Sequence, residues 1–246
     1  MEYNGVTLES IQNCLVKESA VANDLSKQPF STKTIHIIRH GEALHNIDRA
    51  YKLRDPPLTD KGLAQAEALS IQLSTVLKIQ PSAIVTSPMT RTIQTCRTLF
   101  PSAFTDGPDA RAIPLHIWPD LREAHDANCN KGRSRAEMRA LHPDLDFSAC
   151  HEEWDYPAHS FEDAAIRAEA VRKELMKLPG SHIVVVGHRG LIAYMVDTKE
   201  VKFRNCEIRS YRFANAEELE NRRYGVHELQ CEYDFGPSLL VEVPLA

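Results

Sequence analysis

Apolar residues fall into short continuous runs and longer helical stripes, and the two patterns alternate along the chain. The β-branched runs at 34–38, 83–86 and 183–186 predict buried strands. A stripe with three-four spacing predicts a helix that begins at Thr59 or Asp60, and a helix through Leu99 follows the second run. The expected buried face of the first helix consists of Leu63, Ala66, Leu69, Leu73 and Val76. This alternation favours an α/β fold, a three-layer α/β/α sandwich with a mainly parallel central sheet.

The carboxyl-terminal part continues the alternation. Ser160, with Asp163 three residues later, predicts a helix start, and Pro179-Gly180 ends that helix. Its expected inner face consists of Ala164, Ala168, Val171, Leu175 and Leu178. A helix through about Val196 follows the third run, and strands are expected near 208–213 and 239–243.

Residues 101–158 depart from this pattern. The segment is rich in Pro, His, Asp and Cys, and it predicts only a short helix, from after Ser134 to near His142. A long irregular segment inside a compact domain is usually functional, so we expect a substrate-facing insertion here. Its aromatic residues fit a hydrophobic core and a pocket wall equally well: Trp118, Trp154 and Tyr156.

Length and composition set the broad class. A chain of 246 residues supports one domain, expected at 34–246 after an N-terminal extension, 1–33, whose weakly amphipathic segment is expected to pack as a surface helix. A net charge of −5 predicts no nucleic acid or membrane partner, so any affinity for phosphate must be local. The first thirty residues contain no continuous apolar run, which predicts a cytoplasmic protein.

The cysteines and histidines do not fall into metal-ligand spacings. Six cysteines lack any C-x-x-C pair and are expected to be free thiols. Eleven histidines include no H-E-x-x-H pattern. The sequence therefore predicts no metal and no other cofactor, and it leaves the oligomeric state open, with a homodimer as one option.

Polar residues directly follow two of the expected strands. Arg39, His40 and Gly41 end the first run, and His188 follows Gly187 at the end of the third. Arg91 lies in the first turn of the helix after the second run. Because parallel strands present their carboxyl ends at one edge of the sheet, where such folds bind ligands, these residues predict one anion pocket.

Four motifs together resemble the histidine phosphatase superfamily, in its phosphoglycerate-mutase-like branch, over about residues 34–215. They are Arg39-His40-Gly41-Glu42 with Asn46, Leu58-Thr59-x-x-Gly62-x-x-Gln65-Ala66, Ser87-Pro88-x-x-Arg91-x-x-Gln94-Thr95, and Val186-Gly187-His188. The resemblance implies that His40 attacks phosphorus and carries a phosphohistidine. It also implies that Arg39 and Arg91 bind equatorial oxygens and that His188 adds a donor, most useful if cationic.

The leaving oxygen needs a proton, so the chemistry requires an acid near the phosphate. The family carries a carboxylic acid after its third strand, which Leu121-Arg122-Glu123 matches, and Glu123 is the expected catalytic acid. Glu42 and Asp126 remain alternatives, Glu42 more as a supporting residue.

Several further residues have two interpretations. Gly41 lets the backbone approach an anion. Asn46 either donates to phosphate or shapes a turn, and Arg189 either contacts phosphate or narrows the pocket. His36 is expected to be a packed core histidine. A set of basic residues either binds further anionic groups or forms a solvated surface: Arg54, His125, Lys131, Arg133 and Arg135.

These expectations favour a phosphatase that acts on a phosphomonoester or diphosphate of a small molecule. A phosphoglycerate-type mutase is the alternative, but such relatives usually carry Ser and Trp where this chain has Ala43 and His45. A noncatalytic phosphate- or protein-binding module is a third hypothesis, which the intact Arg39, His40, Arg91 and His188 disfavour.

Overall fold

The computed structural model describes residues 33–47, 50–104, 113–155, 160–196, 202–222, 224–226, 232–234 and 236–245. Its centre is a six-stranded sheet of order β3-β2-β4-β1-β5-β8. The strands are β1 (Thr34–Arg39), β2 (Ala83–Thr86), β3 (Leu115–Ile117), β4 (His182–Gly187), β5 (Ile208–Phe213) and β8 (Leu240–Val243). Neighbours from β3 to β1 are parallel, and β5 pairs antiparallel with β1 and β8. The predicted mainly parallel sheet is confirmed.

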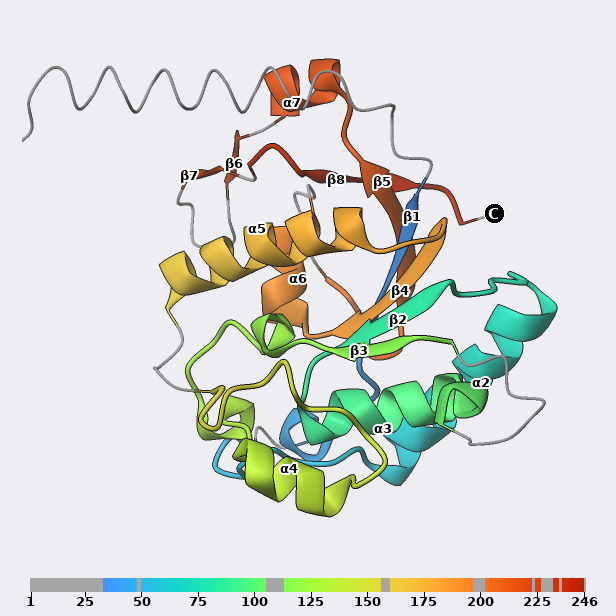
Figure 1. Ribbon diagram of the computed structural model, residues 1–246, viewed down its shortest axis with the longest axis vertical. Coiled ribbons are helices and arrows are strands. Elements are labelled where there is room, and N and C mark those ends of the chain that lie inside the picture. The colour runs from blue at the N-terminus through green and yellow to red at the C-terminus, as the bar shows by residue number, and fades with distance from the viewer. Residues whose placement is uncertain are drawn as a thin grey trace, which may run out of the picture. The chain divides into compact units, whose positions relative to one another are not determined.

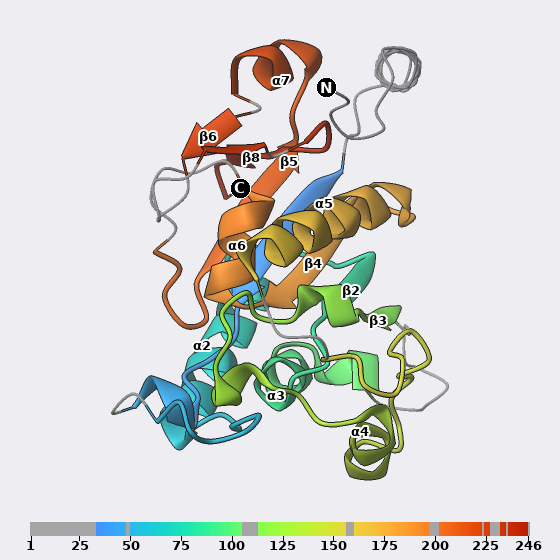
Figure 2. The same ribbon diagram turned by 90° about the vertical axis from the view of Figure 1, so that its left-hand side faces the viewer.

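Helices cover both faces of this sheet, as Figures 1 and 2 show. One layer contains α5 (Phe161–Lys177) and α6 (Arg189–Met195), and the other contains α2 (Asp60–Thr75) and α3 (Thr90–Leu99). The three-layer α/β/α architecture is therefore confirmed. Within the described residues, no helix is long and apolar enough to cross a membrane.

Alternate residues of each central strand enter different cores. In β1, Ile35 and Ile37 pack in the cluster that includes α5 and α6, whereas Ile38 packs in the cluster of α2 and α3. Strands β2 and β4 divide their side chains in the same way. A strand buried on both faces needs apolar residues at every position, which explains why these segments are continuous runs.

The helix starts agree with their sequence signals. Thr59 Oγ1 accepts a hydrogen bond from Gly62 N at 2.9 Å at the start of α2, and Ser160 Oγ accepts one from Asp163 N at 3.0 Å at the start of α5. The short helix α4 (Arg135–Leu141) begins with Ser134 and Glu137 as a capping box. Three expected buried positions are wrong: Val76 is exposed, because it lies past the end of α2, Leu63 is only partly buried in the first turn of α2, and Leu178 is only partly buried at the end of α5.

The insertion contains more structure than its composition predicts. The expected short helix after Ser134 is confirmed as α4, but strand β3 also lies within the insertion and forms one edge of the sheet, so the expectation that the helix is the only regular element there was wrong. Three residues, Leu-His-Ile, are too few for a recognisable strand pattern. The tail adds α7 (Ala216–Arg222) and a hairpin of β6 (Tyr224–Val226) and β7 (Glu232–Asp234), none of which the sequence predicted.

Two expectations fall wholly or largely outside the described residues. Of the N-terminal extension, 1–33, only Lys33 is described, and its Nζ donates to Leu175 O and Met176 O near the end of α5. Tyr156 is also outside them. The proposed domain boundaries stay a prediction.

Candidate active site

The carboxyl ends of β1, β2 and β4 bring the predicted motif residues together. Arg39 is opposite Gly187 in the β1–β4 register, so His40 and His188 follow neighbouring strand ends. Their imidazole centroids lie 5.2 Å apart. Ser87, directly after β2, contacts His188 Nε2 through its Oγ at 3.0 Å. The order of the strands therefore creates the cluster.

The backbone holds the His40 imidazole in one orientation. His40 Nδ1 donates to Gly41 O at 2.7 Å, which leaves Nε2 as the unprotonated nitrogen. His40 is 1% exposed. Burial lowers its pKa well below the usual value, and the positive charges of Arg91 and Arg39 lower that pKa further. The imidazole is thus neutral and suited to nucleophilic attack.

Arg91 lies fully buried behind this histidine pair. Its guanidinium donates to Cys129 O at 2.9 Å and to Asn130 Oδ1 at 3.0 Å, and its third contact is His188 Nδ1 at 3.1 Å. Burial and the charge of Arg91 hold the pKa of His188 well below its ordinary value. The structure therefore contradicts the expectation of a cationic His188: Nδ1 accepts from Arg91, and Nε2 is left to donate to Ser87.

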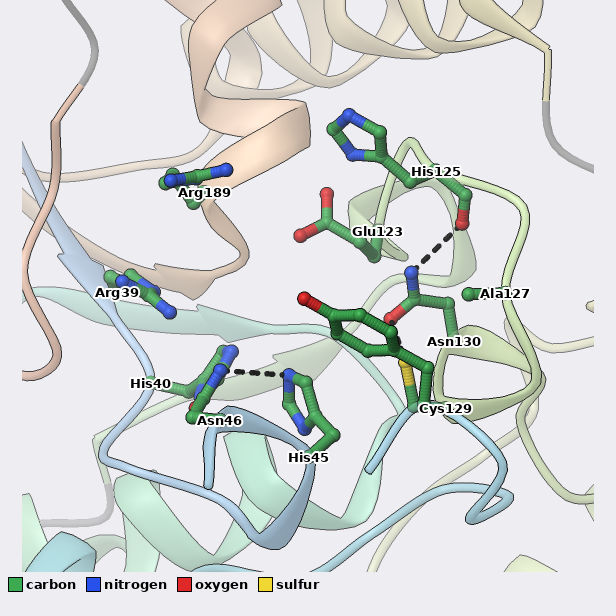
Figure 3. A pocket seen from close by; sticks show the side chains of 11 residues that line it. Arg39, His40, His45, Asn46, Glu123, His125, Ala127, Cys129, Asn130 and Arg189 are labelled. Atoms are coloured by element: carbon green, nitrogen blue, oxygen red, sulfur yellow. Dashed lines mark hydrogen bonds between the residues drawn. The ribbon is translucent and has the colours of Figure 1, made fainter. Parts of the chain in front are cut away.

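A cavity of about 400 Å³ opens beside His40. Figure 3 shows the side chains that line it. Arg39 and Arg189 lie on one side of this view, with Cys129 and Asn130 across from them. The lining residues are Arg39, His40, His45, Asn46, Tyr51, Glu123, His125, Ala127, Cys129, Asn130 and Arg189. Cationic and polar side chains thus surround the proposed nucleophile.

Of the three candidate acids, only Glu123 lines this cavity. Its carboxylate accepts hydrogen bonds from Ala124 N at 2.7 Å, Leu191 N at 3.1 Å and Gly190 N at 3.2 Å. Glu42 instead pairs with Lys61 Nζ at 2.8 Å, and Asp126 is exposed. The geometry therefore favours Glu123 as the acid.

The smaller motif residues have structural roles. Gly41 N donates to Thr95 Oγ1, and a Cβ on Gly41 would lie 2.6 Å from Gly62 O. Gly41 does not line the cavity, so it serves the close contact between the segment after β1 and the first turn of α2. Asn46 does line the cavity, and its Oδ1 accepts from Ala43 N at 3.0 Å, so it also shapes the turn.

The set of further basic residues divides. Only His125 lines the cavity; Arg54 donates to Gly132 O, and Arg133 and Arg135 pair with Asp55 and Glu152. Lys131 is exposed. These four residues therefore belong to the surface or to structural contacts.

The structure also resolves the aromatic and histidine alternatives. Trp154 is buried in a core cluster, and Trp118 is partly buried against another. His36 is buried within β1, with its Nδ1 2.8 Å from Ser210 Oγ, so it is a packed histidine as expected.

Several cavity residues were not predicted as functional. His45 is 5.7 Å from His40 between ring centroids, and burial together with Arg91 and Arg39 lowers its pKa to about 3. Asn130 links Arg91 to His125 O. The available signal for His45 was its departure from the mutase pattern, whereas Asn130 lies in the insertion without any motif.

In the described part of the chain, no cluster of three or more His, Cys, Asp or Glu side chains is positioned to hold a metal ion. The four cysteines in that part, Cys96, Cys129, Cys150 and Cys206, are free thiols.

Comparisons with known proteins agree with this geometry. The family model of the histidine phosphatase superfamily (branch 1) matches residues 35–221. A probable phosphatase of Schizosaccharomyces pombe is 29% identical over 164 residues, covering 63% of this chain and 74% of that protein. A phosphoglycerate mutase-like protein of Arabidopsis thaliana is 28% identical over 225 residues, covering 72% and 83%.

The fold also resembles solved structures. The structure of a putative alpha-ribazole-5'-P phosphatase from Escherichia coli has a TM-score of 0.51 at 20% identity and covers 74% of this chain and 91% of that one. The family match extends over most of the chain and includes all four motifs. The chain therefore belongs to the histidine phosphatase superfamily, branch 1.

Proposed function

We propose that this protein is a cofactor-independent phosphatase, which hydrolyses a phosphomonoester or diphosphate of a small molecule through a phosphohistidine on His40. One observation carries the proposal: the bond from His40 Nδ1 to Gly41 O leaves Nε2 unprotonated in an imidazole that lines a cavity. A metabolite-sized phosphate ester fits a cavity of about 400 Å³.

In the first step, His40 Nε2 attacks phosphorus and the bond from phosphorus to the leaving oxygen breaks. Glu123, which lines the cavity, acts in its protonated form and gives that proton to the leaving oxygen. Arg39 stabilises the charge on the equatorial oxygens from the cavity surface.

Arg91 contributes positive charge from behind the histidines. Its side chain is buried and donates hydrogen bonds to Cys129 O and Asn130 Oδ1. Direct contact between Arg91 and a phosphate therefore requires the turn that contains Cys129 and Asn130 to shift. In the ligand-free protein, burial and the charge of Arg91 oppose protonation of His188. A bound phosphate dianion would favour that protonation.

In the second step, water attacks the phosphohistidine and the bond between phosphorus and Nε2 breaks. The Glu123 carboxylate takes the proton from the water, and inorganic phosphate leaves. The acid of the first step is thereby restored, and no external reactant other than water is consumed.

Two further observations support the wider assignment. The name of the fission yeast relative, a probable phosphatase, favours hydrolysis over phosphoryl return to substrate. Four free thiols in the described residues support a reducing, cytoplasmic location. A homodimer, and the absence of nucleic acid, membrane and cofactor partners, stay predictions.

The function is tested by assaying phosphate release from a panel of phosphorylated metabolites, with His40→Ala as the inactive variant and His151→Ala, an exposed histidine, as the matched control. We expect release by wild type and His151→Ala but not by His40→Ala. The same proteins are incubated with 3-phosphoglycerate and a bisphosphoglycerate primer, and little 2-phosphoglycerate should form. Efficient interconversion would establish the mutase alternative instead.

A further inference from the structure

A second hollow adjoins the proposed catalytic cavity. This groove, of about 910 Å³, is formed by the end of β1, the start of α2, the start of α6 and the segment 202–209. Its lining residues are Arg39, Glu42, Lys61, Gln65, Arg189, Lys202, Phe203, Arg204, Asn205, Glu207 and Arg209. We call it the basic groove.

The basic groove is strongly cationic in a protein whose net charge is −5. Six Lys or Arg side chains line it, against two carboxylates. Both carboxylates already have partners, since Glu42 pairs with Lys61 at 2.8 Å and Glu207 with Arg209 at 2.6 Å. Positive side chains therefore outnumber negative ones in the lining of the basic groove. Such an excess, concentrated in one hollow, attracts an anion.

The basic groove adjoins the catalytic cavity. Arg39 and Arg189 line both, and Figure 3 shows the two side chains on the same side of the cavity. An anion in the basic groove and a phosphate beside His40 would therefore have the same two arginines as neighbours. One molecule can occupy both sites, with Arg39 and Arg189 between its two anionic ends.

Local contacts fix the positions of three arginines that line the basic groove. Arg39 NH1 donates to Phe203 O at 2.8 Å, whereas its buried Nε has no hydrogen-bond partner in the described part of the chain. Arg204 is exposed, and its backbone N–H bonds to Glu207 Oε2, which fixes the turn that carries it. The Arg209 guanidinium packs over Phe203, 4.5 Å from the ring centroid.

We propose that the basic groove binds a second phosphate group of the substrate, so that the preferred substrates are small molecules with two separate phosphates, of which His40 receives one. Arg204 and Lys202 recognise the retained phosphate, and Arg39 and Arg189 contact the connecting region. This proposal rests on the proposed phosphatase function and specifies its substrate class.

The test uses α,ω-alkanediol monophosphates and bisphosphates of increasing length, which differ only in the second phosphate. In the wild type we expect kcat/KM to be at least about tenfold higher for a bisphosphate of suitable length than for its monophosphate, after correction for two equivalent ends. Rising ionic strength should reduce this ratio, because the groove contacts are partly exposed to solvent.

Variants of Arg204 separate the second site from the catalytic site. Arg204→Ala should lose most of the bisphosphate preference and change monophosphate kcat/KM less than about threefold, and Arg204→Glu should abolish the preference. Arg139→Ala, an exposed arginine of α4, is the matched control and should keep it. Melting temperatures establish that each variant is folded.

The two proposals fail differently. If the wild type hydrolyses monophosphates and bisphosphates equally well, or if Arg204→Glu retains the preference, the basic groove is not a phosphate site and the phosphatase function still stands. If none of the phosphate esters is hydrolysed, the proposed function itself fails. Inhibition of monophosphate hydrolysis by an α,ω-alkane bisphosphonate of the preferred length, weakened in Arg204→Glu, gives an independent binding readout.

Discussion

The imidazole of His40 is prepared for its reaction by the residues around it. Gly41 O fixes the tautomer, and the neighbouring arginines keep the ring neutral. These contacts were partly predictable, because charged residues at strand ends are visible in the sequence. Asn130 was not predictable, since it lies in the insertion without any motif, and the only signal for His45 was its departure from the mutase pattern.

The loss of activity on removing the acid at Glu123 should depend on the leaving group of the substrate. Glu123→Gln keeps the side-chain volume but removes the acid, so we expect kcat on alkyl phosphates to fall by roughly 10²–10⁴-fold. Hydrolysis of 4-nitrophenyl phosphate should fall much less, because nitrophenolate leaves without a proton. Equal losses on both substrates would show that Glu123 only positions other groups. Glu42→Gln and Asp126→Asn are the comparison variants.

Stability should depend on pH through His36. Burial, together with the charge of the nearby His182, lowers the pKa of this histidine to about 4. Below pH 6.5 the unfolded chain binds a proton there that the folded protein excludes, so acid favours unfolding until the pH falls to about 4. On acidification from pH 7 to pH 5, this proton uptake lowers the free energy of unfolding by about 2 kcal/mol.

Urea unfolding of wild type and His36→Asn at both pH values measures this contribution. The variant should lose about 2 kcal/mol less stability on acidification than the wild type, whatever its stability at pH 7. An identical loss in the two proteins would show that His36 takes up its proton equally well in the folded state.

Helix α6 and the insertion meet where Gly190 faces Glu123. A Cβ on Gly190 would lie 2.2 Å from Glu123 Oε1 and 2.7 Å from His125 Nδ1. Both are ends of flexible side chains, so an alanine there displaces the carboxylate and leaves the backbone in place. The absence of one side chain on the helix thus sets the position of the proposed acid on the loop.

Gly190→Ala should therefore lower kcat on alkyl phosphates by about tenfold or more, with little effect on 4-nitrophenyl phosphate. The double variant with Glu123→Gln provides the control. Because both changes act through the same carboxyl group, their effects should not add. Fully additive losses would mean that Gly190→Ala perturbs the site by another route.

Elements with many repeats of their pattern were predictable, and short ones were not. The starts of α2 and α5 follow from Thr59 and Ser160 because side-chain caps depend on local sequence. Strand β3 was missed because its pairing with β2, which is not local, defines it. The β6–β7 hairpin escaped prediction for the same reason, as each strand has only three residues.

Across the described molecule, topology converts three distant motifs into one site. The alternation of strands and helices predicted a shared sheet edge, and the strand order places the ends of β2, β4 and β1 side by side there. The local excess of positive charge was not predictable, because Arg189 and the segment 202–209 are near Arg39 only in the folded chain. The net charge of the chain does not reveal how positive side chains are distributed over the folded surface.

A trapped intermediate tests the central claim most directly. Wild-type protein is mixed with a substrate carrying a labelled phosphoryl group, denatured rapidly at alkaline pH and digested, and the label is located by mass spectrometry. We predict an acid-labile phosphoryl group on His40, present in Glu123→Gln as well and absent from His40→Ala. Turnover without any label on His40, or label on another residue, would contradict the account.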